Sequence, residues 1–366
     1  MKVCIIIPTF NSWQVTAETV KKLLYEQTYK DFDIIIVDAG SKDYEKLKEI
    51  FKDEKRVIIL HTEKDLGGAG SFWLGMKYAY EKGYDIFILS DNDAIPLSNN
   101  LIEELIKSEK PCVPINYEKR KLIEKNDYIN WYWFHFLTLD KKIVEKIGFP
   151  AFEFFIWLDD IEYTYKRLGK IKVVKQYYTH KWAADTIKGK SKREYYRLRN
   201  SMLIYFRRTN YTFLNLFRIF FLQIFKLTLE YTKFKHWKYF INFSFEAYND
   251  AINGNFGKVN KKIPLNLAKE LLEIYVPEEF RITSKRKIYN FFKTLFLKKR
   301  TPLIGIYILL KCIILFFKYI KNLHRRYYRR LLWEYYKKNI LYTNVIVIQL
   351  GKIIEEFTLT AKWFAP

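Results

Sequence analysis

The first 110 residues alternate short apolar runs with segments of helical pattern, and this alternation limits the fold more than any other feature of the sequence. Single helix-like segments, such as residues 13–26, separate the apolar runs "VCIIIPTF", "FDIIIVDAG", "VIILHT" and "DIFILSDND". Strands separated by single helices form βαβ units, in which the strands are parallel and helices cover both faces of the sheet. The sequence therefore predicts an α/β fold with a mostly parallel sheet.

Polar side chains follow several of these runs at the point where each predicted strand ends. Thr9 and Phe10 follow the first run, Asp38 the second, and Asp91 and Asp93 the fourth. Because the carboxyl ends of parallel strands meet at one edge of a sheet, these residues should line one cleft, where a nucleotide would bind. Asp38 could instead cap the next helix, and Asp91 and Asp93 could belong to a turn. Two aspartates this close repel each other, which a bound cation would offset.

A glycine-rich stretch, "DLGGAGSFWLGM", follows the third run. We expect Gly67 and Gly68 to lie in a loop before a helix over residues 71–82, where glycine lets the backbone approach a ligand closely. The stretch matches neither the dinucleotide-binding pattern nor the phosphate-binding P-loop.

A second pair of carboxylates, Asp159 and Asp160, follows another apolar run, and His180 follows the predicted strand "KIKVVK". Two separate acidic pairs suit sugar transfer from a nucleotide diphosphate. One pair, with an imidazole, holds a divalent ion that neutralises the departing diphosphate. A carboxylate of the other pair removes the acceptor proton from the opposite face of the sugar, which inverts its configuration. The competing interpretations are an acidic first helical turn for Asp159 and Asp160, and a structural role for His180.

The motifs "IIIPTFN", "IIIVDAGSKD", "DLGGAGSFWLGM", "FILSDNDA", "FFIWLDDIEYTYKRLG", "TH" at 179–180 and "YYRLRNSMLIYF" occur in the order seen in family 2 glycosyltransferases. Over roughly residues 1–258 the chain resembles this family, and most of all its galactofuranosyl- and rhamnosyltransferase branch. The resemblance implies a GT-A fold, which is Rossmann-like. It also implies transfer of a sugar from a nucleotide-diphosphate donor to a hydroxyl of a lipid-linked or polymeric glycan.

The resemblance also implies roles for individual residues. Asp160 would be the general base of an inverting, metal-dependent transfer, and Asp159 and Glu162 would bind the acceptor or orient Asp160. Asp91, Asp93 and His180 would hold Mn²⁺ or Mg²⁺. Further donor contacts would come from Thr9, Phe10, Asp38, Gly67 and Gly68. Two positions depart from the family pattern: Ala39 follows Asp38 where Asn or Asp is usual, and Asp65 replaces an Asn.

Three tryptophans, Trp131, Trp133 and Trp157, are candidates for acceptor binding because sugars stack their apolar faces on aromatic rings. They could equally be core residues. The three cysteines, Cys4, Cys112 and Cys312, are far apart, which argues against a zinc knuckle or a disulfide framework.

Basic residues are concentrated in the C-terminal part of the chain. Residues 1–200 contain 34 Lys and Arg against 30 Asp and Glu, whereas residues 201–366 contain 30 against 10. We therefore predict a catalytic domain over 1–200 and a helical, basic, aromatic-rich region over 201–366. Amphipathic helices of this composition suit an anionic membrane surface, where Arg325, Arg326, Arg329 and Arg330 would meet headgroups. A helical bundle with a solvated basic exterior is the alternative.

The longest apolar stretch, residues 303–317, is too short to span a bilayer and contains Lys311. The N-terminal apolar run is too short for a signal peptide. These features predict a cytoplasmic protein, peripheral on the cytoplasmic face of the membrane. Two other classes remain as alternatives: a basic nucleic-acid-binding protein and a catalytically silent glycosyltransferase-like scaffold. Because the ordered acidic motifs have no purpose in nucleic-acid binding, we predict no nucleic-acid partner.

Overall fold

The computed structural model describes residues 1–180, 187–208, 224–225, 228, 231, 234–255, 257–259, 261–268 and 301–321. These residues form two compact units. The first contains residues 1–180 together with 257–259, and the second contains the other described residues from 187 onward. The long helix that begins at residue 187 lies wholly in the second unit, so the division falls before the predicted boundary at residue 200.

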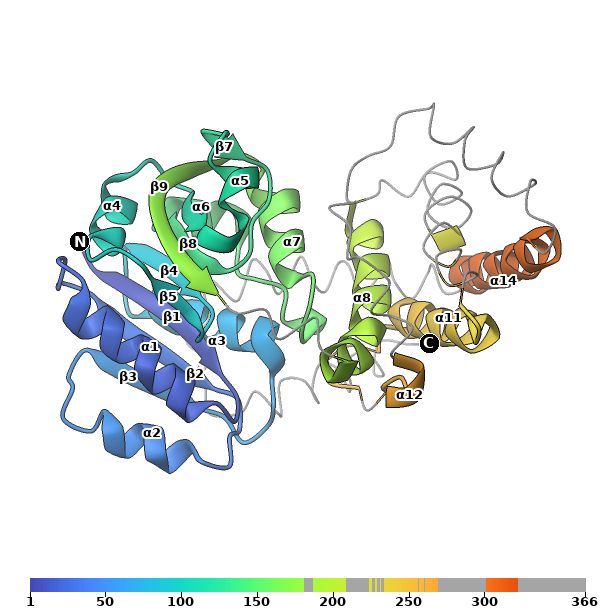
Figure 1. Ribbon diagram of the computed structural model, residues 1–366, viewed down its shortest axis with the longest axis horizontal. Coiled ribbons are helices and arrows are strands. Elements are labelled where there is room, and N and C mark those ends of the chain that lie inside the picture. The colour runs from blue at the N-terminus through green and yellow to red at the C-terminus, as the bar shows by residue number, and fades with distance from the viewer. Residues whose placement is uncertain are drawn as a thin grey trace. The chain divides into compact units, whose positions relative to one another are not determined.

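The first unit is built on one nine-stranded sheet (Figure 1). Its strands are β1 (Val3–Thr9), β2 (Asp33–Asp38), β3 (Val57–His61), β4 (Ile86–Ser90), β5 (Ala94–Pro96), β6 (Cys112–Asn116), β7 (Tyr128–Ile129), β8 (His135–Asp140) and β9 (Ile171–His180). The strand order is β3-β2-β1-β4-β8-β6-β9-β5, with β7 paired to β9. The first four strands in this order are mutually parallel, as the βαβ pattern predicts.

Antiparallel pairing enters the sheet at β8, which runs against both β4 and β6. Strand β9 is parallel to β6 and antiparallel to β5. The apolar runs form the core, since the isoleucines at the centres of β1 and β2 are fully buried. The sheet is therefore mostly parallel in its N-terminal half and mixed in the half that contains the second acidic pair.

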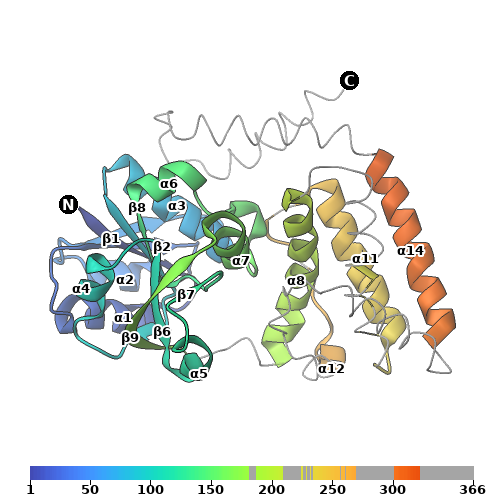
Figure 2. The same cartoon turned by 90° about the horizontal axis from the view of Figure 1, so that it is seen from above.

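The helices of this unit are α1 (Trp13–Glu26), α2 (Tyr44–Ile50), α3 (Gly67–Glu81), α4 (Leu101–Lys107), α5 (Arg120–Ile123), α6 (Lys141–Ile147) and α7 (Asp159–Tyr163). Short turns are η1 (Tyr117–Lys119), η2 (Phe152–Phe154) and η3 (Thr164–Leu168), the last of which continues α7. Figure 2 shows α3 and α6 on one face of the sheet and α1 and α2 on the other. The predicted α/β fold, with a mostly parallel sheet between helical layers, is confirmed.

The second unit is helical in its described residues, as predicted. It contains α8 (Ile187–Arg208), α11 (Trp237–Asn253), α12 (Leu265–Ala268) and α14 (Thr301–Lys321). Helices α8 and α11 are joined by a hydrogen bond from the Tyr195 hydroxyl to Asp250 at 2.6 Å, and Lys261 pairs with the same carboxylate at 2.8 Å. The four arginines predicted to meet lipid headgroups lie outside the described residues.

Candidate active site

Two strand pairings bring the first acidic pair against two histidines. Strand β4 pairs with β8 so that Ser90 lies opposite His135, which places His135 beside Asp91. Strand β5 pairs with β9 so that Ala94 lies opposite His180, which places His180 beside Asp93. Asp91, His135 and His180 each offer a ligand atom within 4.8 Å of the others, a grouping that could hold a metal ion.

His180 lies between the two carboxylates of the first acidic pair. Its Nε2 is 3.0 Å from Asp93 Oδ1 and 3.8 Å from Asp91 Oδ2. Burial acts to lower the pKa of His180, but the hydrogen bond to Asp93 and the charges of both aspartates outweigh it, and the pKa is raised. His180 thus lies beside both predicted carboxylates, whereas the grouping that could hold a metal ion consists of Asp91, His135 and His180.

Sequence reasoning missed His135, which is buried at the start of β8. Its Nε2 lies 3.2 Å from Asp91 Oδ2, its Nδ1 lies 2.8 Å from the Tyr178 hydroxyl, and its ring is 4.1 Å from that of His180. Burial lowers the pKa of His135, although Asp91 opposes this shift. The sequence contained one signal: His135 follows Trp131 and Trp133 at alternate positions, and alternate residues of an extended segment share a face.

The second acidic pair begins α7 and lies near the first. Asp159 is buried and Asp160 is half-buried. Loss of hydration raises the pKa of both carboxyls, and the charge of Asp91 raises both further. Asp159 also raises the pKa of Asp160. The charge of Asp91 acts on Asp159 and Asp160 because the two acidic pairs are close in space, although they are almost 70 positions apart along the chain.

Backbone strain is concentrated immediately before this pair. Phe155, Trp157 and Leu158 have φ of 64°, 73° and 69°, a left-handed conformation that non-glycine residues rarely adopt. Such residues cost on the order of 1–3 kcal/mol each and persist where the surrounding structure holds them, often at functional sites. The turn therefore fixes how α7 begins and how its first two aspartates project.

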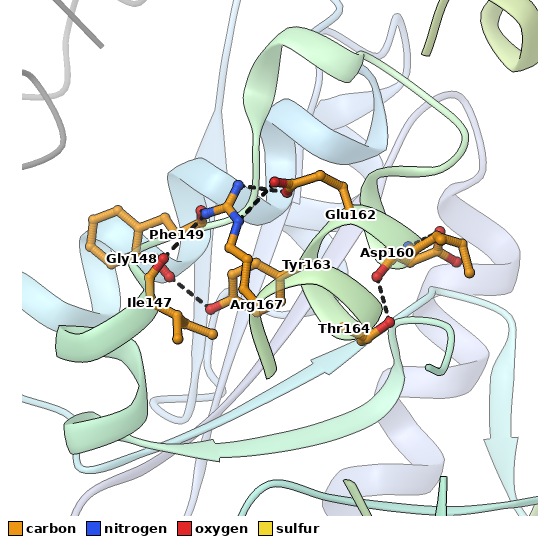
Figure 3. Close-up of polar contacts among 9 residues, drawn as sticks. Ile147, Gly148, Phe149, Asp160, Glu162, Tyr163, Thr164 and Arg167 are labelled. Carbon is orange, nitrogen blue, oxygen red and sulfur yellow. Dashed lines mark hydrogen bonds and ion pairs between the residues drawn. The ribbon is translucent and has the colours of Figure 1, made fainter. Parts of the chain in front are cut away.

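Glu162, predicted to bind the acceptor or orient Asp160, is buried in an ion pair with Arg167 (Figure 3). Arg167 Nε and Nη2 donate to the two carboxylate oxygens at 2.9 and 2.5 Å, and Nη1 donates to the Phe149 carbonyl at 2.8 Å. Figure 3 shows Glu162 and Asp160 projecting from α7 in different directions. This geometry favours a role in holding α7 over direct contact with an acceptor.

The predicted nucleoside-binding residues have different environments. Asp38 is fully buried, where it accepts from Ser41 N at 3.0 Å and contacts His61 Nδ1 at 2.8 Å, and its Oδ2 has no hydrogen-bond partner among the described residues. Phe10 is 42% exposed. Thr9 is buried with its hydroxyl 2.7 Å from that of Thr16, so its side chain serves the turn itself.

Lys258 is a second residue that sequence reasoning missed. The segment 257–259 lies on the first unit, where Gly257 N donates to the Glu153 carbonyl at 3.2 Å. Lys258 Nζ is 3.0 Å from Asp65 Oδ2 and 5.8 Å from the centre of the Phe10 ring. Asp65, one of the two departures noted in the sequence, thus forms an ion pair with Lys258 and keeps its ammonium group beside Phe10.

The glycines of "DLGGAG" form the first turn of α3, which corrects the prediction of a loop before a helix over 71–82. Gly67 has φ of +65°, and a Cβ there would lie 2.2 Å from the Phe155 carbonyl oxygen, so this glycine allows α3 to pack against the strained turn. A Cβ on Gly68 would meet nothing within 4 Å, which leaves open space for a ligand.

The predicted acceptor tryptophans are all partly exposed. The rings of Trp131 and Trp133 meet edge to face at 5.1 Å, and Trp133 stacks on His135 at 5.8 Å. Trp157 belongs to the strained turn. The first two therefore lie next to the histidine cluster, and the third lies next to the second acidic pair.

Comparison with known proteins relates this unit to one family. Residues 4–156 match the family described as "Glycosyl transferase family 2". An uncharacterized glycosyltransferase of Rickettsia conorii is 38% identical over 130 residues, which are 34% of this chain and 21% of the relative. The Escherichia coli protein WfgD, named as a UDP-Glc:α-D-GlcNAc-diphosphoundecaprenol β-1,3-glucosyltransferase, is 27% identical over 127 residues, 35% of this chain and 49% of WfgD.

Among solved structures, Staphylococcus aureus TarS in complex with UDP is similar, with a TM-score of 0.45 and 14% identity over 69% of this chain and 83% of that one. The chain spans half or less of the length of the two curated relatives above. Residues 4–156 of the first unit therefore resemble a family 2 glycosyltransferase domain, and the family match ends just before α7.

Proposed function

We propose that this protein is an inverting, metal-dependent glycosyltransferase that moves a sugar from a nucleotide-diphosphate donor to a hydroxyl of a lipid-linked or polymeric glycan. The observation that carries the proposal is the closeness of the two acidic pairs. Asp91 lies beside His135 and His180, and its charge raises the pKa of both Asp159 and Asp160. A leaving diphosphate and an acceptor hydroxyl need different carboxylates within the span of one sugar.

The residues beside the first acidic pair fit a divalent ion. The His180 imidazole lies 3.0 Å from Asp93 Oδ1 and 3.8 Å from Asp91 Oδ2. Oxygen ligands together with nitrogen ligands suit Mn²⁺, whereas oxygen ligands suit Mg²⁺. Asp91, Asp93 and His180 would hold the ion, which when bound offsets the negative charge of the departing diphosphate. The same carboxylates repel a nucleotide diphosphate when no ion is present, so donor binding should depend on the metal.

The second acidic pair supplies the base. A carboxylate with a raised pKa is a stronger proton acceptor than an ordinary one, and a base works best when its pKa approaches the working pH. Asp160 is partly accessible, whereas Asp159 is buried beside it and raises its pKa. We assign proton removal from the acceptor to Asp160, and tuning of that base to Asp159.

The remaining assignments concern the two substrates. Phe10, Asp38 and Gly68 would contact the nucleoside part of the donor, while Gly67 and Thr9 shape the backbone around it. Trp131, Trp133 and Trp157 would stack on acceptor sugars. The name of WfgD describes a lipid-diphosphate-linked acceptor, which supports an acceptor of that class here. Membership of the galactofuranosyl- and rhamnosyltransferase branch stays part of the proposal.

Donor binding tests this function directly. We expect UDP-, GDP- or dTDP-sugars to raise the melting temperature in the presence of Mn²⁺, because a ligand bound only by the native state stabilises it. The shift should disappear without the ion and in Asp93→Asn, and the stabilising donor should then support sugar transfer to a lipid-linked acceptor. If no nucleotide diphosphate is bound with either Mn²⁺ or Mg²⁺, the chain is a silent scaffold.

We also propose that the helical unit lies on an anionic membrane surface. No helix in the described part of the chain combines the length and apolarity needed to cross a bilayer. Helix α14 instead exposes a row of large apolar side chains at helical spacing: Ile306, Leu310, Ile314 and Phe317, each at least 54% exposed. Such a row suits the interface of a membrane, and the basic excess of residues 201–366 suits its anionic lipids. The unit would then keep the enzyme on the cytoplasmic face beside a lipid-linked acceptor.

Vesicle flotation tests the membrane proposal. We expect the protein to float with vesicles that contain phosphatidylglycerol and to bind neutral vesicles more weakly. Replacing Ile314 and Phe317 by Glu should release it, because each charge opposes burial of the apolar face. The control is Leu122→Glu in α5, a side chain with 61% exposure outside this row, which should leave flotation unchanged. Equal flotation of the α14 variant would contradict the proposal.

A further inference from the structure

The hydrogen bonds around His135 allow its Nδ1 to carry the ring proton. The Tyr132 hydroxyl lies 2.6 Å from the Pro114 carbonyl oxygen, which can only accept, so the Tyr132 proton lies in that bond. Asn116 N donates to the same hydroxyl oxygen at 3.1 Å. Tyr132 is therefore an acceptor toward its third neighbour, the Tyr178 hydroxyl at 3.2 Å, and the proton between them belongs to Tyr178.

When the Tyr178 proton is directed to Tyr132, the Tyr178 oxygen can accept a hydrogen bond from His135 Nδ1, which lies 2.8 Å away. A neutral imidazole protonated at Nδ1 has its lone pair on Nε2. That nitrogen lies 3.2 Å from Asp91 Oδ2, which also presents a lone pair when ionised. Two lone pairs directed at each other repel, and a cation between them removes the repulsion.

The distances suit an ion shared by both atoms. Ligands at right angles in an octahedral site, with bonds of about 2.1 Å, are about 3 Å apart. His135 Nε2 and Asp91 Oδ2 are 3.2 Å apart, and His180 Nε2 and Asp93 Oδ1 are 3.0 Å apart. A metal-binding histidine usually donates its other N–H to a fixed acceptor, and the Tyr178 hydroxyl oxygen offers His135 Nδ1 such an acceptor at 2.8 Å.

We infer that His135 is a direct metal ligand, oriented by Tyr178 and Tyr132, so that the proposed metal centre contains two histidines beside Asp91 and Asp93. The inference rests on the proposed function for the identity of the centre and extends it. Imidazole suits first-row transition ions, whereas Mg²⁺ prefers oxygen. A two-histidine centre therefore selects Mn²⁺ over Mg²⁺, and His135 sets that preference.

Electron spin-echo spectroscopy of Mn²⁺ bound to the full chain tests the inference. It is recorded with Mn²⁺ alone and with Mn²⁺ plus UDP, and it does not require sugar transfer. Wild type should show couplings to two imidazole nitrogens. His180→Gln leaves His135 intact and should keep one coupling, and His135→Gln should keep the other. His180→Gln with bound Mn²⁺ and no nitrogen coupling would overturn the inference, and so would a wild type that binds no Mn²⁺ with or without UDP. The His180 variant gives an answer even if His135→Gln fails to fold.

Affinity measurements supply a second readout. His135→Gln should weaken Mn²⁺ binding by 10-fold to 100-fold and Mg²⁺ binding much less, and Tyr178→Phe should weaken Mn²⁺ binding through loss of the acceptor for Nδ1–H. His236→Gln, a histidine of the helical unit outside this cluster, is the matched control and should leave both affinities unchanged. Two nitrogen couplings without sugar transfer would refute the proposed function alone, whereas transfer with a single coupling would refute only this inference.

Discussion

Asp160→Asn should lower kcat by a factor of 10² to 10⁴ while leaving the Mn²⁺-dependent binding of the nucleotide diphosphate unchanged. The factor is the usual contribution of a general base, and asparagine keeps the shape of the side chain without the ability to accept a proton. Donor binding is retained because Asp160 lies outside the set of Asp91, Asp93 and His180. Steady-state kinetics with the identified donor and acceptor, together with isothermal titration of UDP and Mn²⁺, measure the two quantities.

The same variant should be more stable than wild type at neutral and alkaline pH. Burial and the charge of Asp159 raise the pKa of Asp160 in the folded protein, so the folded state retains the proton at pH values where the unfolded chain has lost it. Stability therefore falls as pH rises above the ordinary aspartate pKa of about 3.9. Asparagine removes this cost. At pH 8 the unfolding free energy should rise by about 1 kcal/mol, which raises Tm by roughly 2–4 °C, and at pH 4 neither should change.

A higher Tm together with a lower kcat in Asp160→Asn would show that the variant has lost a base and is not misfolded, because misfolding would lower both. Asp53→Asn, on an exposed surface turn, is the matched control and should change neither Tm nor kcat. Asp159→Asn should shift the acid limb of the kcat profile to lower pH, because it removes the charge that raises the pKa of Asp160. Activity that survives in Asp160→Asn but is lost in Asp159→Asn would reverse the two roles.

The sequence was most informative where a local pattern determines local structure. Helix α1 has the predicted bounds, and β1, β2 and β4 follow the apolar runs, because strands buried on both faces need continuous apolar side chains. The start of α3 was predicted wrongly, since glycines usually indicate a loop. Gly67 begins the helix instead, because α3 packs closely against the Phe155 carbonyl, a contact between distant segments.

In the candidate site, too, residues next to a local pattern were predicted, and residues placed by pairing of distant segments were not. Asp91 and Asp93 are recognisable because they directly follow an apolar strand, and His180 because it ends another. His135 gave little signal, since its place beside Asp91 depends on antiparallel pairing of β4 with β8 and on the irregularity between Leu89 and Ser90. Such pairings depend on the whole sheet and leave no trace in the local sequence. The partner of Glu162 was missed for a different reason, because Arg167 is near in sequence but its role depends on burial.

Removing Arg167 should destabilise the protein strongly. Its guanidinium neutralises Glu162, donates to the Phe149 carbonyl, and lies 5.4 Å from the ring of Tyr163, whose hydroxyl donates to the Gly148 carbonyl (Figure 3). Arg167→Met leaves the Glu162 carboxylate buried without its counter-charge, which should cost about 3–5 kcal/mol of unfolding free energy. The double variant that also carries Glu162→Gln should regain part of that loss, and urea denaturation measures all three values.

The pair between Arg56 and Glu54 is a matched control, because it has the same two-pronged geometry, with both nitrogen–oxygen distances at 3.1 Å, but is more exposed to water. Arg56→Met should cost about 1 kcal/mol or less. Because Arg167 holds α7, which begins with Asp159 and Asp160, the milder Arg167→Lys should reduce kcat more than Mn²⁺ affinity. Equal costs for Arg167→Met and Arg56→Met, with kcat unchanged in Arg167→Lys, would show that the buried pair does not position the second acidic pair.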